Sequence, residues 1–277
     1  MGIEVSSDLE ALEIGLLTEG VFRQYGIDFR HYAYASLRRR LWHGVNAEKL
    51  GSITQLLDRV LHDTGAMERL LLQLSVNVTS MFRDPTFYRA FREKVVPLLR
   101  SHPFIRIWHA GCSTGEEVYS MAILLEEEGL YERARLYATD MNEAVLAQAR
   151  KGIFAMSMMP EFERNYAASG PKAQLSDYYL ARYDFALFRQ SLRRNVVFAQ
   201  HNLVTDGSFN EFNVILCRNV LIYFDGELQG AVHRLFHSSL RRFGILALGR
   251  KESLHGTVHE ADYTEVDPVE KIYRRSA

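Results

Sequence analysis

The first part of the chain has its hydrophobic residues at helical spacing. Up to about residue 100 this period recurs, so the pattern predicts an all-helical region. The clearest sets are Leu56, Leu57, Val60 and Leu61, followed by Met67, Leu70, Leu71 and Leu74. Asp84 and Pro85 mark a helix start, since an N-cap residue here precedes a proline at the first helical position. Pro97 should kink or end that helix.

After residue 104 short apolar runs alternate with amphipathic stretches. Strands are predicted at 105–110, 136–139, 195–199, 212–217 and 244–248, and helices at 116–128, 143–151 and 230–242. This alternation predicts an α/β fold with βαβ units and a parallel sheet, whose ligands bind at the carboxyl ends of the strands.

The last two apolar runs, 263–266 and 269–273, lie on either side of Asp267-Pro268 and predict a closing hairpin. Residues 152–194 follow neither pattern, so we expect an irregular segment that forms a small insert. We therefore place one domain at 1–84 and a second at 85–277, with the insert inside the second.

Composition narrows the class of protein. The 277 residues contain 33 Lys+Arg and 34 Asp+Glu, a net charge of −1, and 47% are hydrophobic. This balance excludes a disordered chain and a bulk nucleic-acid binder. No apolar run approaches the ~20 residues of a membrane span, and the acidic start does not resemble a signal peptide. Cys112 and Cys217 are too few for a disulfide framework, and a reducing cytoplasm fits best. We also expect a monomer that binds no nucleic acid and does not insert into a membrane.

A glycine-rich turn, GCSTG at 111–115, follows the first predicted strand and precedes a helix that begins with Glu116 and Glu117. Such a turn lets a ligand approach the backbone closely. A dinucleotide fold is the obvious rival, but the turn is not GxGxxG. At ~5 Å and an effective dielectric of ~20, each contact between a carboxylate and a phosphate costs about 3 kcal/mol, more than the ~1 kcal/mol that a helix dipole returns.

A cationic ligand is therefore favoured, and S-adenosylmethionine, with an ammonium and a sulfonium group, fits. Glu116 and Glu117 alone are equally consistent with two acids that complement the helix dipole. Asp140 ends the second strand, where α/β nucleotide folds place an acid on the ribose hydroxyls. A strand-end Asp is more often a helix cap, a role that Asn142 and Glu143 can share. The glycine turn beside it favours the ribose.

Polar residues also follow the third and fourth predicted strands. His201, Asn202 and Leu203 come after one, and Arg218 and Asn219 come after the other. Asn202 can offer an amide to an adenine edge while Leu203 packs on the base, and Asn219 places a second amide beside a methyl donor. The apolar residues after Asn219 have a plain alternative as core, namely Val220, Leu221, Ile222 and Phe224.

Two histidine pairs have helical spacing, His233 with His237 and His255 with His259. Neither motif includes an acid, so we expect exposed surface histidines and no metal site. Cys112 and Cys217 are interpreted as small core or turn residues, since no nucleophile–base constellation accompanies them.

An arginine-rich stretch lies between Asp28 and Glu48, where no acidic residue occurs. Arg38, Arg39 and Arg40 would spread over about 200° of a helix and make a broad basic face. Such a face would steer an acidic helical partner. A solvated helix face is the plain alternative, and nucleic acid is a poorer candidate because the stretch is short.

The ordered motifs NVTSMFRD (77–84), AGCSTGEEVYS (110–120), ATDMN (138–142), HNL (201–203) and CRNVLIYFD (217–225) resemble those of the CheR-type chemotaxis receptor glutamate O-methyltransferases, from about residue 20 onwards. The resemblance implies an N-terminal all-helical receptor-docking domain and a class I, Rossmann-like methyltransferase domain with a C-terminal antiparallel hairpin. It also implies a small β insert at about 152–194. It implies S-adenosylmethionine as cofactor, S-adenosylhomocysteine as product, and the cytoplasmic helices of methyl-accepting chemoreceptors as partner.

The resemblance also implies roles for individual residues, and it tips the arginine stretch toward receptor docking. Asn77, Thr79 and Arg83 would reach over the cofactor, and Gly111 would lie against it. Glu117, with Glu116 nearby, would hold the amino-acid or sulfonium end, Asp140 the ribose, Asn202 and Leu203 the adenine, and Asn219 and Val220 the donor pocket. Tyr223 would lie near the transferred methyl, and Tyr223 or Arg83 would orient the incoming carboxylate. Two departures from the family, Met81 in place of an aromatic residue and Val118 in place of proline, remove no polar ligand.

This chemistry needs no classical base, because a glutamate carboxylate is already ionised at pH 7. Alignment of the carboxylate with the methyl group in a dry cleft should supply most of the rate enhancement. Two other functions stay open from the sequence: a non-catalytic adapter that binds S-adenosyl ligands, and a methyltransferase for a small molecule.

Overall fold

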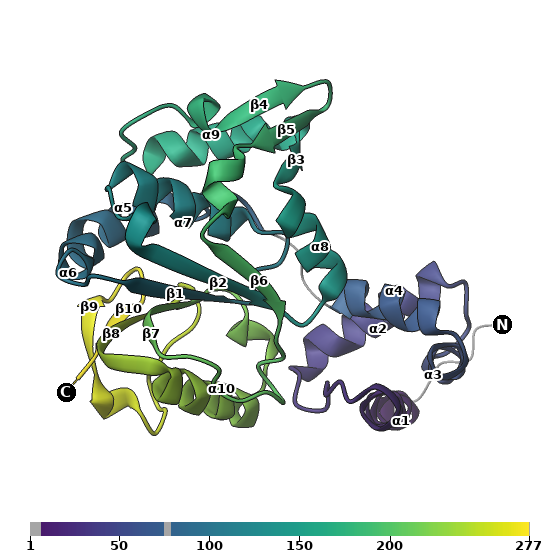
Figure 1. Cartoon of the computed structure of the whole chain (residues 1–277). Helices are drawn as coiled ribbons and strands as arrows, with labels where there is room; N and C mark the ends of the chain where they lie inside the picture. The colour runs from purple at the N-terminus through teal and green to yellow at the C-terminus, as the bar shows by residue number, and fades with distance from the viewer. Residues whose placement is uncertain (1–6, 75–78, 277) are drawn as a thin grey trace. The chain divides into compact units, whose positions relative to one another are not determined.

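The computed structural model describes residues 7–74 and 79–276 (Figure 1). The chain forms two compact units. Unit 1 consists of Met1–Val76 and Ile222–Gln229, and unit 2 of Asn77–Leu221 and Gly230–Ala277. The domain boundary after residue 84 stays a prediction. Among the described residues, none of the helices combines the length and the apolar character that a membrane crossing requires.

Unit 1 is helical, as the spacing of its apolar residues predicts. Its four N-terminal helices are α1 (Ser7–Tyr25), α2 (Tyr34–Ala47), α3 (Ile53–His62) and α4 (Thr64–Leu74). Ser52 caps α3, since its side chain accepts a hydrogen bond from the Gln55 amide at 3.2 Å. The apolar faces meet in a core that includes Leu17, Val21, Leu41, Leu56, Val60 and Leu70.

A segment from much later in the chain, Ile222–Gln229, completes unit 1. The Ala33 amide donates to the Tyr223 carbonyl at 2.8 Å, and the Asp225 amide donates to the His31 carbonyl at 2.9 Å. The rings of Tyr32 and Phe224 lie 5.1 Å apart. The core interpretation of this stretch holds for Leu221 and Phe224, which are buried, whereas Val220 and Ile222 are only partly buried.

Unit 2 contains a seven-stranded sheet with the order β6-β2-β1-β7-β8-β10-β9 among the described residues. The first five strands are parallel, and β10 is antiparallel to both of its neighbours, so the closing hairpin is confirmed. The strands are β1 (Ile105–Ala110), β2 (Ala134–Asp140), β6 (Val196–Gln200), β7 (Phe212–Cys217), β8 (Leu240–Leu248), β9 (Tyr263–Asp267) and β10 (Ile272–Arg275).

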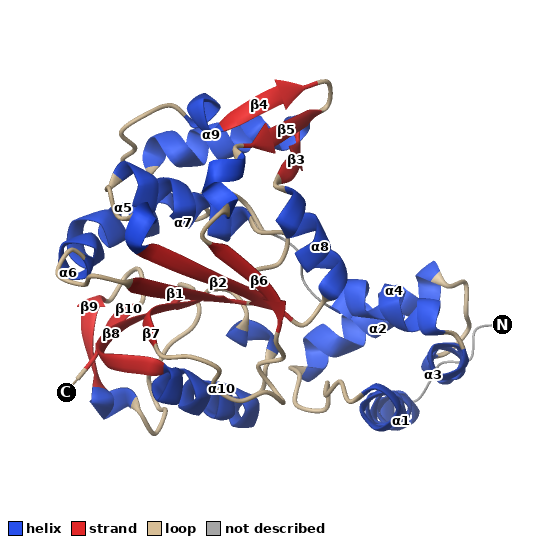
Figure 2. Ribbon diagram, viewed as in Figure 1, coloured by secondary structure: helices blue, strands red, loops and turns tan. Residues whose placement is uncertain are grey.

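Helices cover both faces of this sheet, with α7 (Glu116–Glu127) and α8 (Glu143–Lys151) on one face and α10 (Gly226–Ser239) on the other (Figure 2). From β1 at the centre of the sheet, the chain adds β2 and then β6 on one side. It then adds β7 and β8 on the other side. The order therefore reverses between β1 and β7, and a crevice for a ligand forms at the carboxyl ends of strands at such a point.

The insert is more regular than its residue pattern alone indicates. Residues 152–194 contain a helix, α9 (Met159–Ala168), and an antiparallel sheet of order β3-β5-β4. Its strands are β3 (Ile153–Ala155), β4 (Tyr179–Arg182) and β5 (Phe185–Phe188). The small β insert that the family resemblance implies is therefore confirmed. The residue pattern alone looks irregular because each strand has only three or four residues, too few to show a period.

The helix predicted after Asp84 begins at Pro85 but does not end at Pro97. It runs as α5 (Pro85–Ala90), a π-helical segment η1 (Phe91–Val95) and α6 (Val96–Leu99). The wider π turn accommodates a proline that cannot donate the usual hydrogen bond. Asp84 was also predicted to cap this helix, yet its backbone is left-handed (φ 57°) and its carboxylate accepts from Arg218 at 2.7 Å instead.

Candidate functional site

The glycine turn after β1 leaves no room for side chains at two positions. Gly111 and Gly115 have φ angles of 80° and 96°, a backbone conformation that other residues rarely adopt. A Cβ atom on Gly111 would lie 2.7 Å from the Val220 side chain, and one on Gly115 would lie 3.0 Å from Cβ of Ala149. At these two positions, therefore, no side chain covers the backbone of the turn. The turn lies at the carboxyl end of β1, where the strand order reverses.

Asp140 ends β2 next to this turn. Its Oδ2 accepts a hydrogen bond from the Ser113 amide at 2.9 Å, and its Oδ1 accepts one from the Asn142 amide at 3.0 Å. Asn142, not Asp140, caps α8, because its side chain accepts from the Ala144 amide at 2.9 Å. Burial raises the pKa of Asp140. The backbone of Met141 is a third donor to this carboxylate, which keeps acceptor capacity for a ligand.

Glu116 is the more deeply buried of the two acids that begin α7. It is 3% exposed, and its carboxylate accepts a hydrogen bond from the Thr114 hydroxyl at 2.7 Å. Burial raises its pKa. A backbone hydrogen bond at Glu116 itself adds to that of Thr114. A helix-dipole role requires no burial, and contact between Glu116 and a ligand stays a prediction.

Glu117 belongs to a network of charged side chains that the sequence analysis did not identify. Its carboxylate contacts Nδ1 of His109 at 2.9 Å and the Arg218 guanidinium at 3.4 Å. Arg218 also pairs with Asp84 at 2.7 Å and lies 4.0 Å over the Phe87 ring. Burial alone would raise the pKa of Glu117, but His109 and Arg218 together hold it below its ordinary value.

Negative charge is in excess around the turn. Burial first, and then the nearby charges of Asp140, Glu117 and Glu116, raise the pKa of the Cys112 thiol, so these three carboxylates surround one position. Arg218 is already shared between Glu117 and Asp84. A phosphate would meet this excess charge, whereas an ammonium or sulfonium group would be stabilised by it.

Asn219 and Val220 follow β7 and are held by a residue that the sequence analysis missed. Asn219 has a left-handed backbone, with a φ angle of 62°. The buried carboxylate of Glu252 accepts hydrogen bonds from the amides of Asn219 at 2.9 Å, Leu221 at 2.7 Å and Gly249 at 2.5 Å. Glu252 lies just after β8, so one acid from the neighbouring strand end fixes the loop against the glycine turn.

Asn202 and Leu203 are partly buried at the carboxyl end of β6. The Asn202 side-chain oxygen accepts from the Val204 amide at 3.0 Å, which leaves its NH2 group as the donor for a ligand. The buried His201 ring contacts the carbonyl of Gly207 at 3.1 Å through Nε2. Its side chain therefore stabilises the loop.

The segment before α5 is described only from residue 79 onwards, so Asn77 lies outside the described residues. Thr79 is partly buried at the start of that segment. Arg83 lies between two left-handed residues, Phe82 (φ 50°) and Asp84 (φ 57°), and its carbonyl accepts from Arg218 at 3.4 Å. These contacts connect the segment to the charged network.

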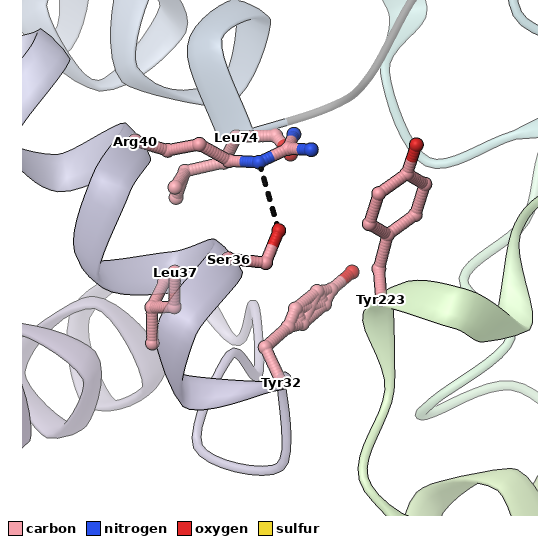
Figure 3. A pocket seen from close by; sticks show the side chains of 6 residues that line it. All are labelled: Tyr32, Ser36, Leu37, Arg40, Leu74 and Tyr223. Carbon is pink, nitrogen blue, oxygen red and sulfur yellow. Dashed lines mark hydrogen bonds between the residues drawn. The ribbon is translucent and has the colours of Figure 1, made fainter.

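Tyr223 lines a small pocket within unit 1 (Figure 3). The pocket holds about 10 Å³, close to the volume for one water molecule, and its other lining residues are Tyr32, Ser36, Leu37, Arg40 and Leu74. Arg40 extends from α2 with its guanidinium 4.8 Å from the centre of the Tyr223 ring, and its Nε donates to Ser36 at 3.2 Å (Figure 3). A cation over an aromatic face is attractive.

The three arginines of α2 do not form one broad basic face, which corrects the expectation from the sequence. Arg38 pairs with Glu10 of α1 at 2.8 Å. Arg40 is partly buried and turned toward Tyr223, and burial lowers its pKa. Arg39 is exposed and makes no ion pair with any described residue. The sequence analysis considered only the stretch between Asp28 and Glu48, and the acid that pairs with Arg38, Glu10, lies outside it on α1.

Both cysteines are buried free thiols, as the core interpretation predicts, and burial raises their pKa. The histidine prediction was partly wrong. His255 is exposed, but His233 is 1% exposed within the core, because α10 turns that face toward the sheet. Met81 and Val118, the two departures from the family pattern, are buried apolar residues.

The sheet is mostly parallel, and a glycine turn and a strand-end acid lie at its carboxyl edge among several carboxylates. This combination is typical of a class I S-adenosylmethionine-dependent methyltransferase. Comparison with protein families agrees in both parts of the chain. Residues 12–75 match "CheR methyltransferase, all-alpha domain", and residues 77–269 match "CheR methyltransferase, SAM binding domain". The chain belongs to the CheR methyltransferase family, and its cofactor is S-adenosylmethionine.

Relatives align with most of the chain. "Putative methyltransferase Cher3" of Pseudomonas putida is 46% identical over 96% of this chain and 97% of its own length. A "Chemotaxis protein methyltransferase" of Listeria monocytogenes is 29% identical over 89% of this chain and 90% of its own. Among solved structures, the N-methyltransferase NodS from Bradyrhizobium japonicum with S-adenosyl-L-homocysteine has a TM-score of 0.35 and 13% identity, over 62% of this chain and 63% of that one.

Proposed function

We propose that the protein transfers the methyl group of S-adenosylmethionine to glutamate side chains of chemoreceptors, forming methyl esters. The single observation that supports this most is the excess of carboxylates around a bare glycine turn, which favours a cationic donor. The chemotaxis methyltransferase relatives support the receptor as substrate, since they align with nearly all of this chain.

The reaction is balanced without a proton acceptor. A carboxylate oxygen forms a bond to the methyl carbon as the bond from that carbon to sulfur breaks, which gives a methyl ester and S-adenosylhomocysteine. S-adenosylmethionine supplies an activated methyl on a positively charged sulfur. The negative nucleophile and the positive leaving group are both neutralised, so the protein contributes chiefly by alignment and exclusion of water.

The binding roles follow from the chemistry of each group. Asp140 would hold the ribose with its remaining acceptor capacity, and Asn202 would donate its amide to the adenine while Leu203 packs against the ring. Glu116 and Glu117 would stabilise the ammonium end of the donor. Gly111 would let the donor reach the backbone, since Val220 already fills the space that a Cβ atom would need.

Arg83 and Tyr223 are the proposed orienting groups for the incoming carboxylate. A phenol hydroxyl and a guanidinium can both donate hydrogen bonds to a carboxylate, and neither transfers a proton to it at pH 7. Arg39 is proposed to attract the receptor, because it is exposed and makes no ion pair with any described residue, unlike Arg38.

The test is transfer of a tritiated methyl group from labelled S-adenosylmethionine to membranes that contain cognate receptors. We expect label on receptor glutamates that is released as methanol in mild base, because a carboxylate ester is base-labile. Receptors with the methylated glutamates changed to alanine serve as the control.

Two results would contradict the proposal. Tight binding of S-adenosylhomocysteine without any transfer to several receptors would indicate a ligand-binding adapter instead. Base-stable label on a small molecule would indicate a different methyl acceptor.

A further inference from the structure

Arg40 is a partly buried cation that lies against the ring of Tyr223 inside unit 1. Its guanidinium carbon is 4.8 Å from the centre of that ring (Figure 3). Within residues 7–74 and 79–276 it makes no ion pair with an acid. Burial lowers the pKa of Arg40, and interaction with Tyr223 acts in the opposite direction. A guanidinium that loses water without gaining a carboxylate is costly, so stability alone does not explain this position.

Two hydrogen bonds fix the position of the guanidinium. Its Nε donates to the hydroxyl of Ser36 at 3.2 Å, one turn earlier in α2. Its Nη1 donates to the carbonyl of Leu74, at the end of α4. The last carbonyls of a helix have no partner within the helix and carry partial negative charge, so a cation is stabilised there. Two helices therefore hold Arg40 beside Tyr223.

The backbone at Tyr223 is fixed by the turn that precedes α2. The Tyr223 carbonyl accepts a hydrogen bond from the Ala33 amide at 2.8 Å, and Phe224 forms an antiparallel bridge with Tyr32. A tyrosine side chain still has two torsion angles of its own when its backbone is fixed. The direction of the Tyr223 hydroxyl therefore depends on what contacts the ring, and Arg40 is such a contact.

The space beside the ring is too small for the ring to move into. The pocket that Arg40 and Tyr223 line holds about 10 Å³, enough for one water molecule but not for a phenol. Loss of the Arg40 head group would enlarge this pocket, and the ring could then turn inward. Arg40 therefore restricts the ring both by attraction and by occupying space.

We propose that Arg40 is a positioning residue for methyl transfer, which holds the Tyr223 hydroxyl where it can donate to the incoming carboxylate. The proposal rests on the proposed function, in which Tyr223 orients the acceptor glutamate. Arginine has donors but no acceptor, so its hydrogen bonding to a phenol uses the phenol oxygen and leaves the O–H to donate to another group. A carboxylate misplaced by about 1 Å can react about 100-fold more slowly, so a residue that touches neither substrate nor cofactor can affect kcat.

Receptor docking is the main alternative role for Arg40. Its neighbour Arg39 is exposed, and its charge is available to a partner in solution. Arg40 instead directs its guanidinium toward Ser36, Leu74 and Tyr223 (Figure 3). Loss of Arg40 should therefore act on kcat, whereas loss of a docking residue should act on the KM for the receptor.

The test is a double-mutant cycle on receptor methylation with the full chain. Arg40→Gln should lower kcat about 10- to 100-fold, while the receptor KM and the affinity for S-adenosylhomocysteine stay within about 2-fold of the wild type. Tyr223→Phe, which removes the hydroxyl and keeps the ring, should also lower kcat. The double variant should be no slower than Tyr223→Phe, because Arg40 then has no hydroxyl to position. An arginine with a merely structural role would slow both backgrounds by the same factor.

Two further variants keep the test decisive if Arg40→Gln is poorly folded. Arg40→Lys keeps the cation but loses the planar fork that reaches several partners at once, so it should recover part of the lost kcat. Tyr32→Phe removes a hydroxyl from the other tyrosine of the same pocket, and its effect should multiply with that of Arg40→Gln. Circular dichroism and melting temperatures show whether the helices of each variant are folded.

The outcomes separate this inference from the proposed function. Equal slowing by Arg40→Gln in the wild-type and Tyr223→Phe backgrounds overturns the inference. A higher receptor KM with unchanged kcat also overturns it, and indicates docking. In both cases the wild type still methylates receptors, so the proposed function stands. A wild type that transfers no methyl group to receptors would overturn both.

Discussion

The glycine turn of unit 2 and helix α2 of unit 1 both have several charges of one sign within a few residues. The two regions differ in how many of these charges are paired with opposite charges. Around the turn, Asp140 and Glu116 have no cationic partner among the contacts described above, and Arg218 is divided between two acids. On α2, Glu10 neutralises Arg38, and Arg40 turns inward. A run of like charges therefore marks a ligand site only where distant segments leave it unpaired.

The largest expected effect distinguishes the ion pairs of the two regions. Arg218→Ala removes a side chain that is 2% exposed, takes this partner from Asp84 and leaves Glu117 with His109. We expect a loss of about 3–5 kcal/mol in the free energy of unfolding, measured by urea denaturation. Arg38→Ala, with its side chain 51% exposed, is the matched control and should cost less than about 1 kcal/mol. Equal losses would remove the contrast between the regions.

Asp140→Ala should have the next largest effect, on the cofactor rather than on the fold. Loss of a charged acceptor costs about 1–3 kcal/mol, so the affinity for S-adenosylhomocysteine should fall about 5- to 150-fold by calorimetry. Glu143→Ala, three residues later and exposed, is the control and should bind normally. Unchanged affinity in Asp140→Ala would mean that the ribose lies elsewhere.

Two acids should show pH dependences of opposite sign. Burial raises the pKa of Glu116, so its contribution to stability is full below the ordinary value of 4.5 and is lost as the pH rises through its folded pKa. Glu116→Gln should therefore gain stability relative to the wild type from pH 4 to pH 7, while it binds the cofactor more weakly.

Glu10 provides the opposite case in unit 1. Hydrogen bonds from Arg38 and then Trp42 lower its pKa, so its stabilising contribution is present above 4.5 and is lost as the pH falls through the folded pKa. Glu10→Gln should be less stable than the wild type at pH 7, and this deficit should shrink toward pH 3. Urea midpoints measured across the range test both variants, and slopes of the same sign would contradict the comparison.

The smallest expected effect concerns receptor docking. Arg39→Glu should lower kcat/KM for receptor methylation a few-fold, more at low salt than at high salt, because an exposed charge acts mainly on association. Affinity for S-adenosylhomocysteine should be unchanged. Arg23→Glu, an exposed charge reversal on α1, is the control. A rate that does not depend on salt would exclude a steering role for Arg39.

The sequence predicts the elements that have a strong period and the residues that follow them. β1 and α8 have the predicted bounds, and Asp140 and Asn219 lie at strand ends as expected. It does not predict partners that only the sheet brings together. Glu252 is 33 residues from Asn219 and Arg218 is 101 residues from Glu117, and nothing local marks either pair.

The same limit explains the histidines and the insert. His237 and His259 belong to different pairs in the sequence, yet their rings stack 4.0 Å apart because the fold brings α10 and the turn before β9 together. In the insert, strands of three or four residues are stabilised by pairing with one another rather than by local propensity. Periodicity therefore locates the edge of the sheet where a ligand binds, but not the side chains that hold this edge in place.

The chain passes between the two units three times, since Ile222–Gln229 belongs to unit 1 while the residues on both sides belong to unit 2. The helical unit is therefore not a detachable module. A truncation that begins at residue 77 would remove the pairing partners of Tyr223 and Asp225, and would expose Phe224 and Leu228, which are 6% and 5% exposed in the intact chain. Forms that lack the N-terminal helices would lose order in the loop after β7, so an active fragment has to retain those helices.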